Sequence, residues 1–170
     1  MLYNGRKFDI RTYMLISTNN GILRAYWYRE GYVRTSSYIW RLDQITDSFV
    51  HLTNDAVQKN SEDYGKYEPG NKLTYADLQR YLDTISRPQS RKSNYNFMAE
   101  IYPKLKQIAT DAVKATFTSI DPQRKASNFE IFGFDFMIDS NFKPWLIEIN
   151  TNPCLELSCP ILERLIPSMV

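Results

Sequence analysis

Cysteine and histidine are scarce in this sequence. Its 170 residues include two cysteines, Cys154 and Cys159, and a single histidine, His51. So few potential ligands exclude a disulfide-rich scaffold and a zinc site built from these residue types. Catalysis by a cysteine nucleophile is not expected either, because the one possible base, His51, is distant in the sequence. A reducing, intracellular compartment is the simplest interpretation.

Long apolar stretches, strong charge and several catalytic motifs are also missing. No run approaches the roughly 18 apolar residues of a membrane helix, and the opening residues MLYNGRKF lack the apolar core of a signal peptide. The formal net charge is only +2, so no strongly basic nucleic-acid-binding surface is predicted. We therefore expect no membrane and no nucleic acid among the partners, whereas an acidic protein partner is compatible with the charge. The GxSxG, P-loop and HExxH patterns are absent.

The composition is that of one globular domain spanning residues 1–170, with 43% hydrophobic and 24% charged residues. Segments 8–17 and 22–30 flank an Asn-Asn-Gly turn and predict a hairpin, with a further short strand at 32–36. Thr74 caps a predicted helix that ends at residue 85. A loop is predicted at 61–72 and a polar connector at 86–94. Helical structure is predicted at 97–120, with a start or kink at Pro103. A last helix is predicted from residue 155; Pro160 interrupts it and it ends near Pro167.

A second predicted hairpin, formed by residues 129–139 and 143–150, has one acidic face. Strand alternation places apolar side chains on the other face: Phe132, Phe134, Phe136 and Ile138, joined across the turn by Trp145, Ile147 and Ile149. The acidic face carries Gly133, Asp135 and Met137, then Leu146, Glu148 and Asn150. A turn of about four residues places Asp135 opposite Glu148. A hard cation such as Mg²⁺ would relieve the repulsion between them, and the alternative is a solvated face whose acids pair with arginine or lysine.

Charged residues also alternate along the first predicted strand. Lys7, Asp9 and Arg11 share one face, while the apolar residues between them share the other. Such a row could hold a phosphate and a carboxylate substrate, or it could be an exposed, self-neutralised face. Arg29 and Arg34 follow on the next strands, and a planar guanidinium suits carboxylates and acyl phosphates.

Five segments, taken in order, resemble the tubulin–tyrosine ligase family. They are RKFDIR at 6–11, YREG at 28–31 followed by RTSS at 34–37, HLTN at 51–54 followed by QK and YGKYE up to residue 68, FGFDFM at 132–137, and WLIEIN at 145–150. The resemblance covers nearly the whole chain and is weakest over 86–128. Five ordered motifs are far more specific than any one of them.

The resemblance implies an α+β fold, namely the C-terminal part of an ATP-grasp fold with an antiparallel sheet and flanking helices. It implies ATP and Mg²⁺ as cofactors. The implied metal ligands are Asp135, Glu148 and Asn150. The implied nucleotide contacts are Lys7 on phosphate and His51, Thr53 and Asn54 on ribose or phosphates. The residues implied to line the substrate and acyl-phosphate region are Asp9, Arg11 and Arg29.

The implied reaction joins an amino acid to a protein tail. ATP phosphorylates a carboxylate to give an acyl phosphate, and the amine of the second substrate attacks it, leaving an amide and phosphate. The implied partners are a free amino acid and the acidic C-terminal tail of tubulin, in the cytoplasm on microtubules or at a cilium or basal body. Whether the amino acid is tyrosine, glutamate or glycine stays open, because YREG and YGKYE are similar to the tyrosine-adding members while Thr151-Asn152-Pro153 is closer to glutamylases or glycylases.

A non-catalytic alternative also stays open. The family carries preceding subdomains that supply phosphate-binding lysines and an adenine hinge, and these 170 residues contain neither. The chain is accordingly interpreted as truncated on its N-terminal side, and a truncated, inactive tubulin-binding module is the second hypothesis. We expect these residues alone to bind ATP weakly, to ligate nothing and to be poorly soluble.

Overall fold

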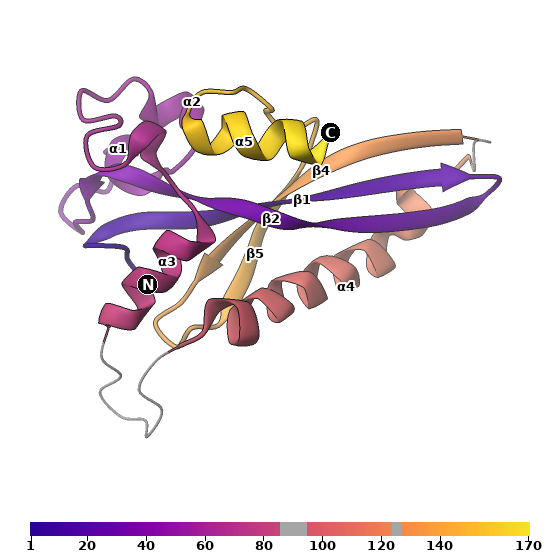
Figure 1. Cartoon of the computed structure of the whole chain (residues 1–170), viewed down its shortest axis with the longest axis horizontal. Coiled ribbons are helices and arrows are strands. Elements are labelled where there is room, and N and C mark those ends of the chain that lie inside the picture. Colours follow the sequence, from indigo (N-terminus) through magenta and orange to yellow (C-terminus); the bar gives the residue numbers. More distant parts are fainter. Residues whose placement is uncertain (86–94, 124–126) are drawn as a thin grey trace.

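An antiparallel five-stranded sheet organises the molecule (Figure 1). The computed structural model describes residues 1–85, 95–123 and 127–170, and within them the strand order is β3-β2-β1-β4-β5. The strands are β1 (Arg6–Asn19), β2 (Ile22–Ile39), β3 (Lys72–Leu73), β4 (Ser127–Ile138) and β5 (Pro144–Thr151). The helices are α1 (Ser48–His51), α2 (Asp55–Gln58), α3 (Tyr75–Thr84), α4 (Tyr102–Ile120), which continues a π-helical turn at Phe97–Ile101, and α5 (Pro160–Met169). The predicted α+β class, an antiparallel sheet with flanking helices, is confirmed.

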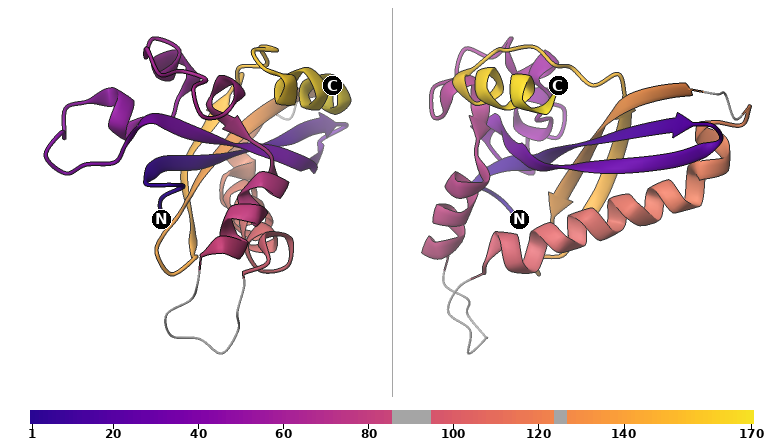
Figure 2. Two further views of the ribbon diagram at one scale, coloured as in Figure 1. Left: turned by 60° about the vertical axis from the view of Figure 1, so that its left-hand side comes forward. Right: turned by 45° about the vertical axis from the view of Figure 1, so that its right-hand side comes forward.

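Helices cover both faces of the sheet (Figure 2). On one face α3 and α4 pack on the main core, where Phe8, Ile10 and Phe134 of the sheet meet Leu78 and Leu105 of the helices. On the other face α5 covers a smaller cluster that includes Tyr13, Tyr32 and Leu165. Among the described residues, no helix has both the length and the apolar character needed to cross a membrane.

The helix boundaries follow from local chemistry. Thr74 accepts a hydrogen bond from the backbone of Asp77, and the Asp77 side chain bonds back to Thr74, so the predicted cap of α3 is confirmed as a capping box. The helix predicted from residue 155 was wrong in its start: α5 begins at Pro160, because proline suits a first helical turn, where no amide donor is needed. Of the two predicted alternatives at Pro103, a start or a kink, the start is confirmed, since this residue stands in the first turn of α4.

Two further predictions need correction. The segments predicted as separate strands at 22–30 and 32–36 form the continuous strand β2. The loop predicted at 61–72 contains a 3₁₀ turn at Pro69–Asn71 and the first residue of β3. The connector predicted at 86–94 lies outside the described residues.

The predicted apolar face of β5 is correct at Ile149 but wrong at Trp145 and Ile147, because the ladder between β4 and β5 contains a bulge. Asp135 pairs with Glu148, but Phe136 pairs with Leu146, so Ile147 is an extra residue. The bulge turns Leu146 toward the core. Trp145 now pairs with Met137, whereas Ile149 still pairs with Phe134 as the predicted alternation requires. All three residues are exposed: Trp145 by 49%, Ile147 by 56% and Ile149 by 41%.

Candidate functional site

Four charged residues from three neighbouring strands form a buried network. Arg34 donates to both carboxylate oxygens of Asp9, at 2.7 and 2.6 Å. Its Nη2 atom also lies 2.8 Å from Asp135 Oδ2. Arg11 forms a bidentate pair with the same Asp135, in which Nη2 donates to Oδ2 at 2.9 Å. The sheet register explains both pairs, because Asp9 lies opposite Arg34 and Arg11 lies opposite Asp135.

The network is neutral, and this neutrality makes its burial possible. The four side chains are between 2% and 10% exposed, and two cations are matched by two anions. Burial alone would raise the pKa of Asp135, but the hydrogen bond from Arg11 and the charges of Arg34 and Arg11 hold it below its ordinary value. Burial likewise opposes the charge of Arg34, yet Asp9 and Asp135 raise its pKa above the usual value.

The HLTN segment reaches this network through one residue. The hydroxyl of Thr53 donates to Asp9 Oδ2, so Thr53 fixes the carboxylate that holds Arg34. Asn54 occupies the N-cap position of α2, without a capping hydrogen bond from its side chain, and borders the cavity described below. His51, the last residue of α1, does not border the cavity. Its Nε2 atom lies 2.8 Å from the carbonyl oxygen of Gln44.

The acidic hairpin places its three polar side chains together. Glu148 lies opposite Asp135, and Asn150 lies opposite Gly133. The Nδ2 atom of Asn150 is 3.2 Å from Asp135 Oδ2 and 3.1 Å from Glu148 Oε1. Gly133 leaves room for Arg11, since a Cβ atom there would lie 3.3 Å from Arg11 Nη1 and 2.9 Å from Pro153 Cβ.

The oxygen donors of this hairpin suit Mg²⁺, which prefers one or two carboxylates and completes its shell with phosphate and water. Glu148 is exposed and free to contribute, and the Asn150 amide is half-buried beside it. Asp135 is 1% exposed and already accepts from two guanidinium groups. Among the described residues, no group of three or more His, Cys, Asp or Glu side chains could hold a metal. A metal here would therefore depend on the amide and on substrate oxygens.

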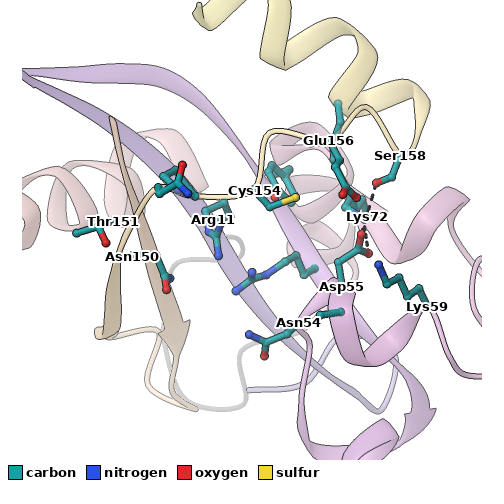
Figure 3. A pocket seen from close by; sticks show the side chains of 16 residues that line it. Arg11, Asn54, Asp55, Lys59, Lys72, Asn150, Thr151, Cys154, Glu156 and Ser158 are labelled. Carbon is teal, nitrogen blue, oxygen red and sulfur yellow. Dashed lines mark hydrogen bonds and ion pairs between the residues drawn. The ribbon is translucent and has the colours of Figure 1, made fainter. Parts of the chain in front are cut away.

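An open cavity of about 340 Å³ extends from this hairpin (Figure 3). It starts at Asn150, passes Arg11 and Arg34, and ends between α2, β3 and the loop 152–158. Charged groups of both signs line it: Arg11, Arg34, Lys59, Lys72, Asp55 and Glu156. The cavity can therefore receive a small charged ligand beside the buried network.

The far end of the cavity was missed in the sequence. There Lys72 Nζ donates to Asp55 Oδ1 at 2.7 Å, and its side chain is only 2% exposed. The Tyr64 hydroxyl donates to the same oxygen at 2.8 Å. Asp55 begins the four-residue helix α2 and Lys72 begins the two-residue strand β3, so both elements are too short for any periodicity to signal the contact. The one available signal was the position of Asp55 directly after the HLTN motif.

Arg29 is not brought to this site. Its side chain is 86% exposed, and it borders a different hollow with Tyr75 and Tyr102. Arg29 and Arg34 are five positions apart, and an odd separation places two residues on opposite faces of a strand. The structure therefore does not bring Arg29 together with the other predicted site residues, whereas Arg34 lies in the buried network with Asp9 and Asp135. Lys7 shares the site face of β1, is partly buried and lies beside Ser36, whose hydroxyl accepts from the Lys7 amide at 3.0 Å.

Known proteins with similar sequences indicate the family of the chain. The chain is 33% identical over 166 residues to tubulin glycylase 3B of Tetrahymena thermophila, covering 98% of this chain and 13% of that protein. It is 36% identical over 157 residues to the probable tubulin polyglutamylase TTLL9 of Rattus norvegicus, covering 92% of this chain and 32% of that protein, and the Mus musculus protein of the same name matches equally. The chain thus spans about a third or less of the length of these curated relatives. A profile of the tubulin-tyrosine ligase family matches residues 1–170, and the chain therefore belongs to that family.

Proposed function

We propose that this chain forms the catalytic C-terminal part of an ATP-dependent ligase that joins a free amino acid to the acidic tail of tubulin through an acyl phosphate. One observation carries the proposal: Arg11 and Arg34 are held by buried carboxylates beside Glu148 and Asn150, at the mouth of a charged cavity. The relatives support tubulin as the protein substrate, since they are named a tubulin glycylase and probable tubulin polyglutamylases.

The hairpin would hold the metal end of the site. Glu148 and Asn150 are the accessible ligands, and Asp135 would join them by exchanging a contact with an arginine. Mg²⁺ bound there would neutralise the negative charge of the ATP phosphates. Lys7 would contact phosphate, and Asn54 at the cavity rim would contact the nucleotide. In this proposal Thr53 acts through Asp9, and His51 supports the HLTN segment through Gln44.

The arginines would stabilise the reacting carboxylate. A tail carboxylate phosphorylated by ATP carries its charge on the phosphoryl oxygens. Attack by the neutral amine would move negative charge to the carbonyl oxygen of the tetrahedral intermediate, which collapses to the amide as phosphate leaves and the nitrogen gives up its proton to water. Preorganised donors lower such barriers because they need no reorientation during the reaction. Arg34 and Arg11 meet this requirement, since Asp9 and Asp135 fix both guanidinium groups. No covalent enzyme intermediate is required.

Glycine and glutamate are the favoured amino acids, because the similar proteins are named for glycylation and glutamylation. A microtubule location in the cytoplasm, at a cilium or a basal body, follows from the proposed substrate. The second candidate is a tubulin-binding module without ligase activity. The arginine contacts that already neutralise Asp135 favour it, because they leave that carboxylate a weaker metal ligand.

Replacing Arg34, with Arg29 as the control, tests the proposal. In the complete protein that carries these residues, Arg34→Ala should lower turnover about 100-fold or more, as loss of a preorganised donor does. Arg29→Ala is the matched control on the same strand and should retain turnover. The assay measures incorporation of labelled glycine or glutamate into tubulin with Mg²⁺ and ATP. Unchanged turnover in Arg34→Ala, or no incorporation by the unmodified protein, would sink the ligase proposal in favour of the binding module.

A further inference from the structure

The far end of the cavity is not used by the proposed metal and nucleotide contacts. It lies at the end away from Asn150, where α2 and its C-cap residue Lys59 meet Lys72 and the loop 152–158 (Figure 3). Asp55 and Lys59 both border it, four positions apart. One anion and one cation on the same helical turn match the two charges of a free amino acid, an ammonium and a carboxylate.

The hydrogen bonds of Asp55 are unequal. Its Oδ1 atom accepts from Lys72 Nζ at 2.7 Å and from the Tyr64 hydroxyl at 2.8 Å. Within the described part of the chain, Oδ2 has one contact, from the Ser158 hydroxyl at 3.5 Å, which is at the limit of a hydrogen bond. One oxygen is therefore saturated and fixed, while the other has lone pairs left for a donor in the cavity.

Lys72 fixes this carboxylate rather than binding the ligand itself. Its side chain is 2% exposed, and its Nζ atom also donates to the carbonyl oxygen of Gly70 at 3.0 Å. Burial raises the pKa of Asp55, but hydrogen bonds from Lys72 and Tyr64, with the charges of Lys72 and Lys59, bring it below the ordinary value. Asp55 is thus an anion at neutral pH, suited to hold an ammonium group but not to remove its proton.

Lys59 provides the opposite charge. It is exposed, and within residues 1–85, 95–123 and 127–170 it makes no ion pair, in contrast to the buried Lys72. Its ammonium group is therefore available to a ligand carboxylate at the cavity mouth.

We propose that Asp55 and Lys59 form a clamp for the free amino acid, in which Asp55 Oδ2 binds the amino group and Lys59 binds the α-carboxylate. The inference rests on the proposed function, since it assigns a place to the second substrate of that reaction. The amino nitrogen then lies between Asp55 and the arginine end of the cavity, where the acyl phosphate forms. Asp55 positions the nitrogen, and the clamp contacts only groups that all α-amino acids share.

Ligand analogues that lack one charge test the clamp in the complete protein. Calorimetric titrations in the presence of Mg²⁺ and a non-hydrolysable ATP analogue compare glycine with glycolate, which lacks the ammonium group, and with glycinamide, which lacks the carboxylate. Glutamate is compared in the same way with 2-hydroxyglutarate, which lacks the ammonium group. The unmodified protein should bind glycine or glutamate about 10- to 100-fold more tightly than the analogue without the ammonium, as expected for one charged hydrogen bond. Asp55→Asn should abolish this preference, and Lys59→Gln should abolish the preference for glycine over glycinamide.

A second aspartate–lysine pair serves as the control. Asp63 accepts from Lys66 at 3.0 Å outside the cavity, and its side chain is 27% exposed, as is that of Asp55. Asp63→Asn and Lys66→Gln should keep both preferences. If Asp55→Asn distorted the site in general, it would weaken the binding of all ligands equally. Lys59 is exposed, so Lys59→Gln provides a second test that does not depend on the packing around Asp55.

The results separate the clamp from the ligase proposal. Three outcomes overturn the clamp. The ligand preferences could survive in Asp55→Asn and Lys59→Gln, they could vanish equally in the control variants, or the unmodified protein could show no such preference. If the protein nevertheless ligates, the proposed function stands without it. If the preferences behave as expected but no amino acid is incorporated, the clamp stands as an amino-acid site and the ligase proposal falls.

Discussion

At the scale of single residues, the charge balance of the site depends on Asp135. This carboxylate lies between Arg11 and Arg34, and it is 1% exposed. Without its charge, two guanidinium groups would face each other in the sheet with only Asp9 to offset them. Unpaired buried charges are among the most destabilising features in proteins.

Asp135→Asn should therefore lower the free energy of unfolding by about 3 to 5 kcal/mol, because it removes one partner of a buried ion pair. Urea denaturation of the 170-residue chain, followed by circular dichroism, measures this loss. Asp43→Asn is the control, since Asp43 pairs with Arg41 at an exposed position. A loss no larger in Asp135→Asn than in the control would contradict the importance of the network.

Acid should weaken the same network. The pKa of Asp135 is lower in the folded protein than its ordinary value. The contribution of this carboxylate to stability is therefore fully present above its pKa in the unfolded chain, about 4. It is lost as the pH falls through its pKa in the folded protein. As the pH falls below about 4, the unmodified chain should lose more stability than Asp135→Asn. Urea midpoints collected across this range measure the difference, and parallel pH profiles would exclude Asp135 as the titrating group.

Strand parity explains which site residues could be predicted from the sequence. It correctly brought Asp135, Glu148 and Asn150 together, because their contact depends only on a hairpin register. The same rule separates Arg29 from Arg34, but the sequence interpretation grouped them by motif instead. The pair of Asp55 and Lys72 could not be predicted, since it joins a four-residue helix and a two-residue strand through tertiary packing.

At the scale of elements, α3 depends on its N-terminal cap. Thr74→Ala should cost about 1 kcal/mol in the free energy of unfolding, because the amide of Asp77 loses its acceptor. Thr118→Ala, at an exposed position in α4, is the matched control and should cost nothing, since alanine is the better helix former. Urea denaturation of both variants decides the matter, and equal effects would show that the capping box is dispensable.

The elements themselves were predicted where local chemistry determines them. The turn at Asn19–Gly21, the cap at Thr74 and the first turn at Pro103 are set by neighbouring residues, and each was located. The bulge beside Asp135 was not, because nothing in the alternation of β5 marks Ile147 as an extra residue. That one insertion moved Leu146 to the core and Ile147 into solvent.

At the scale of the whole molecule, the metal end of the site is open to water. Glu148 is exposed, and Asp135 is already neutralised by arginine. Hydrated or neutralised carboxylates exert little electrostatic leverage.

We therefore expect the 170 residues alone to bind Mg²⁺-ATP only weakly, with a dissociation constant of about 1 mM or more. This constant corresponds to a binding free energy no more favourable than about −4 kcal/mol. Isothermal titration calorimetry measures it. Micromolar binding would show that this chain holds the nucleotide without further contacts. Exposed Trp145, Ile147 and Ile149 on the edge strand also predict self-association, which light scattering during the titration would reveal.

The pairing of Arg11 with Asp135 across 124 positions has a consequence for synthesis on the ribosome. The hairpin of β1 and β2 emerges long before β4, the strand that supplies this second counter-ion and pairs with the other side of β1. Until then the nascent chain presents an open strand edge, which is a template for wrong pairing, and the native partner arrives only after a long, slow-to-close loop. Translation products that end before residue 127 would lack β4 altogether, so early stop codons should yield chains that quality control removes rather than smaller folded domains.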